Sequence, residues 1–196
     1  MLYKHIRDIG PTLDKENKFM FFEIKKSAIT SVRRRSLKDR AVVRKDSWEK
    51  YYEHFDKYSN EDIDNIFKFT IIRNPFERYV STFFYLRKYE KINRIAKFKQ
   101  FTKTIFKERN VDINFHFHRM SDKVCFDGEV FVDFVARLEN IEKDWQYISE
   151  QIGNSNPLPH FNKTEHQHYR TYYDSACVKI VENIYSEDLK IFGYHF

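Results

Sequence analysis

The sequence contains little glycine, proline or cysteine and has no long apolar run. Four glycines and four prolines in 196 residues are too few for a collagen-like or low-complexity chain. The two cysteines, Cys125 and Cys177, cannot form a disulfide framework and fit a reducing compartment. No stretch approaches the ~18 apolar residues of a membrane span, and the amino-terminal MLYKHIRDIGPTLDKENK lacks the apolar core of a signal peptide. We therefore expect one domain over residues 1–196, cytoplasmic and without membrane insertion.

Basic residues outnumber acidic ones, and aromatic residues are abundant. The net charge is +6, and 18% of the residues are Phe, Trp or Tyr. The aromatic content supports a dense core. The positive balance favours an anionic partner, which could be a nucleotide, a nucleic acid, an acidic glycan or a membrane surface. A lysine-rich surface without a specific partner is the alternative.

Strand and helix patterns alternate along the chain. Short apolar runs predict strands at Phe19–Ile24, Phe67–Ile72 and Phe131–Val135. Helices are predicted from an N-cap at Thr30 to Arg40, and at Ser47–Lys57, Pro75–Tyr89, Ile141–Ile152 and Tyr172–Phe192. This alternation indicates an α/β fold with a central, mainly parallel sheet flanked by helices. Ligands bind beyond the carboxyl ends of such strands, where residues 25–29 and 73–75 are expected to lie.

The first of these two loops lies in FFEIKKSAITSVRRR, which begins at Phe21. A strand, a Lys/Ser/Thr turn and a helix start form the outline of an anion site, because a helix N-terminus attracts phosphate or sulfate. Lys26 could add a charge, and Thr30 and Ser31 could donate hydroxyl hydrogen bonds. The segment has no glycine, so the nucleotide-triphosphatase pattern is absent. A strand that simply runs into a basic helix is the alternative.

The second loop lies in RNPFERYVSTFFYLR, which begins at Arg73. Arg73 ends a strand, and Ser81 lies two turns into the following helix. The planar fork of arginine can bind two oxygens of one phosphate, so the pair could clamp a phosphate. A strand–proline–helix junction with surface arginines is the alternative.

These two segments carry a resemblance to a known family. RNPFERYVSTF resembles the 3′-phosphate motif R-x-P-x-x-R-x-x-S-x-F/Y of the carbohydrate branch of the sulfotransferases (sulfotransferase family 2). FFEIKKSAITSV resembles the family's 5′-phosphosulfate loop, commonly P-K-x-x-x-T-S. Downstream segments also match in order, including NFHFHRMSDKVC, FVDFVARLENIEKDW, LPHFNKT and YSEDLKIFGYHF. The resemblance spans roughly residues 19–196.

The resemblance implies a P-loop-like three-layer fold that binds 3′-phosphoadenosine 5′-phosphosulfate (PAPS). The sulfuryl group would pass in line to a hydroxyl of a carbohydrate, with no obligatory metal. Lys26 would support the leaving oxygen, Thr30 and Ser31 would hold the 5′-phosphate, and Arg73 with Ser81 would hold the 3′-phosphate. The expected donor contacts are Lys25, Lys26, Ser27, Ala28, Ile29, Thr30, Ser31, Arg73 and Ser81, together with Lys163 and Thr164 of a later loop.

The acceptor hydroxyl needs a general base, and histidine is the usual choice. His54 lies between the two phosphate motifs, and His116 matches the histidine of the family's N-x-H-W segment. A carboxylate or another histidine is a further alternative. The paired phosphate motifs argue against a general nucleic-acid binder, which needs no such spacing.

Two positions depart from the family's loop. Lys25 stands where proline is usual, and Ile29 stands where a small residue is common just before Thr-Ser. A branched side chain can block the close backbone approach that glycine permits. Either Lys26 and the helix start hold the sulfate, or donor affinity is reduced and the chain is a degenerate relative that binds nucleotide or anionic glycan. An active enzyme would act in the cytoplasm of a bacterium, on a cell-surface glycan or its precursor.

Overall fold

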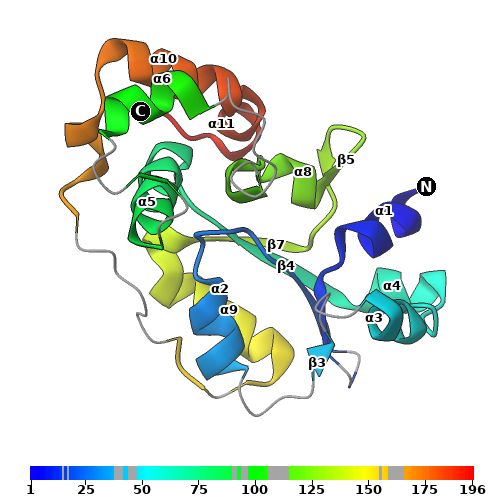
Figure 1. Ribbon diagram of the computed structural model, residues 1–196. Coiled ribbons are helices and arrows are strands. Elements are labelled where there is room, and N and C mark those ends of the chain that lie inside the picture. Colours follow the sequence, from blue (N-terminus) through cyan, green and yellow to red (C-terminus); the bar gives the residue numbers. More distant parts are fainter. Residues whose placement is uncertain are drawn as a thin grey trace. The chain divides into compact units, whose positions relative to one another are not determined.

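The computed structural model describes residues 1–14, 16, 18–37, 42–43, 48–89, 92–93, 97–105, 115–154, 156–158 and 166–196. The chain divides into two compact units (Figure 1). Unit 1 comprises Met1–Ile72 and Asp122–Phe161, and unit 2 comprises Arg73–Ser121 and Asn162–Phe196. Each unit encloses a hydrophobic cluster of its own. The expectation of one domain over the whole length stays a prediction.

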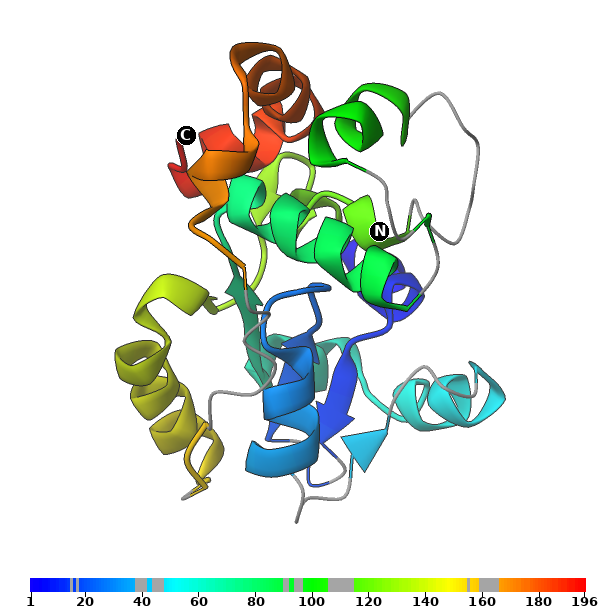
Figure 2. The same ribbon diagram turned by 60° about the vertical axis from the view of Figure 1, so that its left-hand side comes forward.

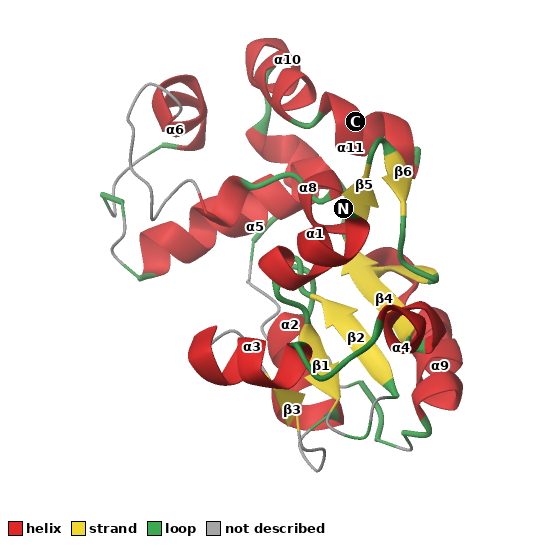
Figure 3. Ribbon diagram, turned by 90° about the vertical axis from the view of Figure 1, so that its right-hand side faces the viewer, coloured by secondary structure: helices red, strands yellow, loops and turns green. Residues whose placement is uncertain are grey.

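Unit 1 is built around a five-stranded sheet of order β3-β1-β2-β4-β7 (Figure 3). The strands are β1 (Thr12–Asp14), β2 (Phe19–Phe22), β3 (Val42–Val43), β4 (Phe67–Ile72) and β7 (Phe134–Arg137). β2, β4 and β7 pair in parallel, whereas β1 pairs antiparallel with both β2 and β3. Since β3 therefore points the same way as β2, the sheet is mostly parallel. The predicted strand at residues 67–72 is confirmed as β4, and the one predicted at residues 19–24 is β2, which ends two residues earlier at Phe22.

Helices cover both faces of this sheet. On one face a buried cluster joins Phe21, Phe69 and Ala136 of the strands to the π-helical segment η1 (Val32–Ser36), which follows α2 (Ile29–Ser31), and to α9 (Ile141–Ile152). On the other face Phe22 packs 5.1 Å from Phe131, whose ring meets His5 of α1 (Leu2–Ile9). The α/β fold with a central sheet between helices is thus confirmed.

The third predicted strand is displaced along the chain. A strand was expected at Phe131–Val135, but β7 starts at Phe134. Before it, the turn at Asp127–Gly128 has positive φ at both residues and closes a hairpin, because Asp-Gly suits the type I′ conformation. Asp133 then accepts a hydrogen bond from the backbone N–H of Lys68 at 2.6 Å, so its side chain braces the start of β4. The hairpin strands are β5 (Cys125–Phe126) and β6 (Glu129–Val130).

Several further elements complete unit 1. They are α3 (Trp48–Phe55), α4 (Asn60–Asn65) and η4 (Leu138–Asn140). The short helix α8 (Ser121–Val124) also belongs to unit 1 except for its first residue, Ser121, which is assigned to unit 2. α3 confirms the helix predicted near Ser47–Lys57. α9 confirms the helix predicted at Ile141–Ile152, and it ends on Gly153 in the left-handed conformation. Within the described parts of the chain, no helix is long and apolar enough to cross a bilayer.

Unit 2 is helical in the parts that the structure describes (Figure 2). Its elements are α5 (Pro75–Lys88), α6 (Phe98–Thr104), η3 (Phe115–Phe117), η5 (Tyr169–Tyr172), α10 (Ser175–Ile184) and α11 (Ser186–Phe192). As predicted, α5 starts with Pro75 in its first turn, and the side chain of Asn74 caps it by accepting from Phe76 N at 2.9 Å. In Figure 2 the long α5 runs below α6, α10 and α11. The core between them is rich in Phe and Tyr.

The last predicted helix is divided. We expected one helix from Tyr172 to Phe192, but α10 ends before Tyr185 and α11 begins after it. The carboxylate of Asp174 caps α10, accepting from Cys177 N at 2.8 Å. Tyr185 is 1% exposed, and its hydroxyl donates to the carbonyl of Phe117 at 3.0 Å. This buried anchor lies where the helix breaks.

Candidate functional site

The loop after β2 bends through two left-handed residues, and neither is glycine. Lys26 has φ 68° and Ala28 has φ 61°. For an L-residue this conformation costs roughly 1–2 kcal/mol. A turn that brings successive N–H groups to one side forms a concavity that binds anions. The loop therefore has the curvature that glycine usually supplies, at an energetic cost.

The helix after this loop starts earlier than the sequence predicts. We expected Thr30 as the N-cap, but that position belongs to Ala28, and Thr30 is the second residue of α2. Because Ala28 is left-handed, the chain turns directly into the helix at Ile29. The first N–H groups of a helix have no hydrogen-bond partner within the helix, and the methyl side chain of Ala28 cannot accept a hydrogen bond from them. The predicted extension to Arg40 ends at Ser36 as far as the structure describes, since residues 38–41 lie outside the described chain.

The side chains of the loop differ in exposure. Ser27 is fully buried, and among the described residues its hydroxyl oxygen has no hydrogen-bond partner. Ser31 is also buried, at 3% exposure. Lys25, Lys26, Ala28 and Ile29 are partly exposed, and Thr30 is exposed. Lys25, Lys26 and Thr30 are thus open to solvent, whereas Ser27 and Ser31 are covered.

Glu23 fixes the base of the loop, although no sequence motif indicates this residue. Its carboxylate accepts a hydrogen bond from the hydroxyl of Thr12 at 2.5 Å and forms an ion pair with Arg33 of η1. It thereby joins β1, the end of β2 and the helix that follows the loop. Such bracing can hold strained residues in place.

Lys123 is a further cation near the loop that no motif indicates. It lies in α8, and burial lowers the pKa of its amine. Among the charges around it, Asp122 and Glu23 raise that pKa, whereas Lys25 lowers it. Its electrostatic contact with Lys25 and Glu23 places it in the surroundings of the loop, although it is distant in sequence.

In unit 2, Arg73 and Ser81 stand along one side of α5. Arg73 precedes the helix, and its Nη2 donates to Glu77 Oε1 at 2.8 Å. Glu77 and Ser81 are four residues apart, so they share a face of the helix. The side chain of Arg73 is 13% exposed and Ser81 is 2% exposed. The guanidinium is therefore held beside the face that carries the serine.

Arg78, the second arginine of the same motif, is buried and has a different role. It is 2% exposed, and its Nη2 donates to the carbonyl of His118 at 2.8 Å. Its Nη1 donates to the carbonyl of His116 at 3.5 Å, and the ring of Tyr185 lies 4.9 Å from the guanidinium carbon. With the bond from Tyr185 to Phe117, three successive carbonyls accept from buried side chains.

The same segment is held from its other end by Asp188 of α11. The carboxylate is fully buried and accepts from Met120 N at 2.9 Å and from Ser121 N at 2.8 Å. Burial raises the pKa of Asp188, and the two backbone hydrogen bonds oppose that rise. We call Arg78, Tyr185 and Asp188 the carbonyl-and-amide clamp. It fixes residues 116–121, which include the candidate base His116.

The two candidate histidines lie in different units. His116 belongs to η3 and is partly buried, with its ring 5.0 Å from that of Tyr85. His54 belongs to α3, and its Nε2 lies 3.3 Å from the hydroxyl of Tyr58, which donates to the carbonyl of Asp14.

The position of Asp14 sets His54 apart from the loop. Asp14 ends β1, and the register of β1 on β2 places that end beside the start of β2. Lys26 follows the other end of β2. The structure therefore does not bring His54 to the loop. Lys163 and Thr164, the two donor contacts expected from a later loop, lie outside the described residues.

Comparisons with known proteins give one result. A family model described as "Sulfotransferase family" matches residues 11–195. The match covers both phosphate motifs and both candidate histidines. The comparison with curated proteins found no significant match, and the comparison with solved structures found none.

Proposed function

The chain belongs to the sulfotransferase family, and we propose that it transfers a sulfuryl group from PAPS to a hydroxyl of a carbohydrate. The observation that carries this proposal is the loop with left-handed Lys26 and Ala28. Strained residues of this kind persist where the surrounding structure holds them, and they cluster at ligand sites.

We assign the donor contacts by unit. In unit 1, Lys26 with the backbone N–H groups of Ile29 and Thr30 binds the 5′-phosphosulfate, and the hydroxyls of Thr30 and Ser31 support it. In unit 2, Arg73 and Ser81 bind the 3′-phosphate. Lys25, Ser27 and Ala28 shape the loop, and Lys163 and Thr164 stay proposed contacts to the donor.

The chain's residues would act on the reaction as follows. A bond forms between the acceptor oxygen and sulfur while the bond from sulfur to the bridging phosphate oxygen breaks. His116 takes the proton of the acceptor hydroxyl. Lys26 stabilises the electron pair that moves to the phosphate oxygen, which is the charge that develops in the transition state. We keep His116 as the proposed base because His54 lies beside the start of β2, at the opposite end of that strand from the loop.

A nucleotide-binding experiment tests the donor site. The product 3′,5′-ADP should raise the melting temperature, since a ligand at 100 times its Kd adds about 2.7 kcal/mol of stability. 5′-AMP should bind more weakly because it lacks the 3′-phosphate. Arg73→Lys should remove most of this preference, because lysine lacks the planar fork. Absence of any shift with saturating 3′,5′-ADP would end the donor-site proposal.

A transfer experiment separates an enzyme from a binding protein. The assay follows radiolabelled sulfate from PAPS onto a panel of oligosaccharides. Lys26→Ala should abolish transfer and leave the fold intact, because alanine already occupies a left-handed position two residues away. Normal turnover in this variant would remove Lys26 from the mechanism. Binding of 3′,5′-ADP without transfer to any acceptor would support the alternative of a catalytically degenerate nucleotide-binding protein.

A further inference from the structure

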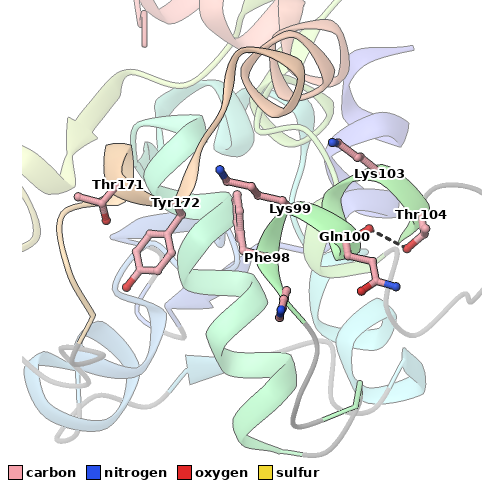
Figure 4. A pocket seen from close by; sticks show the side chains of 8 residues that line it. Phe98, Lys99, Gln100, Lys103, Thr104, Thr171 and Tyr172 are labelled. Carbon is pink, nitrogen blue, oxygen red and sulfur yellow. Dashed lines mark hydrogen bonds between the residues drawn. The ribbon is translucent and has the colours of Figure 1, made fainter.

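Unit 2 contains a hollow of about 660 Å³ that is separate from the phosphate motif (Figure 4). Residues of α6 form one side, and Thr171 and Tyr172 of η5 form the other. Figure 4 shows Lys99 and Lys103 extending to the same side of α6, as their spacing of four residues requires. Neither motif predicts this site.

The charge of the hollow is predominantly positive. Lys97, Lys99 and Lys103 line it, and Asp174 lies close to two of them. The Asp174 carboxylate is 3.8 Å from the Lys99 amine and 3.9 Å from the Lys103 amine, which is too long for a hydrogen bond. The two lysine side chains are 55% and 52% exposed. The hollow thus has three lysines and one nearby carboxylate, which faces two of them, so Lys99 and Lys103 can turn to an anion.

The walls of the hollow suit a sugar better than a nucleobase. Phe98 is only 6% exposed, and its ring packs 5.8 Å from that of Tyr172. These rings are in contact with each other, so they provide no open platform on which bases could stack. Lysine stems offer apolar surface to the C–H faces of a sugar ring. Gln100 and Thr104 add groups that can both donate to and accept from sugar hydroxyls.

The hollow is linked to α5, which carries the proposed 3′-phosphate site. Tyr172 packs against Phe84 with ring centroids 5.2 Å apart. Phe84 follows Ser81 by three residues, so it lies one turn further along the same side of α5. All of these residues belong to unit 2.

We propose that this hollow binds an acidic oligosaccharide. The carboxylate or sulfate groups of the oligosaccharide contact the lysines of the hollow, and its sugar rings pack against the apolar walls. The inference rests on the proposed function in one respect. It takes the bound oligosaccharide to be a region of the acceptor glycan that is distant from the hydroxyl to which the sulfuryl group is transferred. It makes the enzyme one that prefers an already acidic glycan. Binding by the hollow itself requires neither PAPS nor turnover.

Calorimetric titration without nucleotide tests the site. The probes are a hyaluronan hexasaccharide, a heparin-derived hexasaccharide, neutral chitohexaose and a six-nucleotide oligothymidylate. Both acidic sugars should bind, and their affinity should fall as salt rises. The double variant Lys99→Gln/Lys103→Gln should weaken both roughly tenfold. The matched control is Lys50→Gln/Lys143→Gln, which removes the same charge from exposed positions of unit 1 and should bind like the wild type.

Asp174→Asn provides a test of the opposite sign. Asparagine caps helices as well as aspartate does, so α10 should stay intact. Because the competing carboxylate is gone, both acidic sugars should bind several-fold more tightly. Three outcomes would each overturn the proposal. The first is unchanged or weaker binding of the acidic sugars by Asp174→Asn, and the second is an equal loss of sugar affinity in the two double lysine variants. The third is tighter binding of oligothymidylate than of the sugars. A missing response to 3′,5′-ADP with intact sugar binding would refute the donor site and leave this site standing.

Discussion

Replacing Ala28 with glycine should stabilise unit 1, whereas alanine-to-glycine changes normally destabilise. At φ 61° alanine is in a region that glycine enters freely. The substitution removes one methyl group from the partly exposed edge of the unit 1 cluster and introduces no new contact. Its sign therefore reports on the backbone of the loop.

The expected magnitude is the balance of three contributions. Relief of the left-handed conformation contributes roughly 1–2 kcal/mol to stability. The larger conformational freedom of glycine in the unfolded chain lowers the free energy of unfolding by roughly 0.5–1 kcal/mol. The lost contacts of the methyl group reduce the gain a little further. We expect a net stabilisation of about 0.5 kcal/mol.

The matched control is Ala136→Gly, in β7 of the same unit. Ala136 is fully buried in the same cluster and lies in a strand, where glycine is unfavourable. It should lose roughly 0.5–1 kcal/mol for backbone freedom and about 0.8 kcal/mol for the buried methyl. The two variants should therefore differ by about 2 kcal/mol.

Urea unfolding followed by tryptophan fluorescence measures this difference. The chain has two tryptophans, Trp48 and Trp145, and both belong to unit 1. Trp145 is buried in the cluster that Ala28 and Ala136 contact, so its emission reports the relevant unfolding. If Ala28→Gly destabilised as much as Ala136→Gly at equal m-values, the left-handed turn would be absent in solution. The structural support for the anion site would then be lost.

Two further predictions concern unit 2. His116→Ala should lower the rate of transfer by roughly 10²–10⁴-fold and abolish its pH dependence, because the general base is gone. The control His54→Ala should keep the wild-type pH profile. The reverse result would assign the general base to His54. For Asp188, burial raises the pKa above the ordinary value of an aspartate, so its contribution to stability is complete below the pKa of the unfolded chain and is lost as the pH rises through the higher folded pKa. Relative to Asp188→Asn, the wild type should lose stability between acid and neutral pH in thermal melts, and parallel curves for the two proteins would contradict the raised pKa.

Much of the framework could be predicted from local sequence patterns. β4 was placed at its observed residues because FKFTII is apolar, β-branched and bounded by a proline-led helix. The predicted helix at Ile141–Ile152 is α9, and the glycine that follows it is a local stop signal. In both cases the signal is local, and tertiary contacts agree with it. The Asp127–Gly128 hairpin also carries a local signal, because Asp-Gly favours the tight turn between β5 and β6.

The parts that were missed depend on contacts between distant residues. Nothing in the letters around Glu23 shows that its carboxylate holds both Thr12 and Arg33. Ala28 gave no indication of a left-handed conformation, since alanine favours the right-handed helix and only the fold imposes this φ. The break at Tyr185 likewise follows from its hydrogen bond to Phe117, in a segment far away in the sequence.

The carbonyl-and-amide clamp has a consequence for how acceptor preference can change. The carbonyls of residues 116–118 already accept from Arg78 and Tyr185, so a lone pair of each is committed before any sugar arrives. If His116 is the base, as proposed, an acceptor beside it would be recognised mainly by side chains, which evolve one substitution at a time. A lineage could thus shift from one glycan to another while the backbone around the proposed base stays fixed.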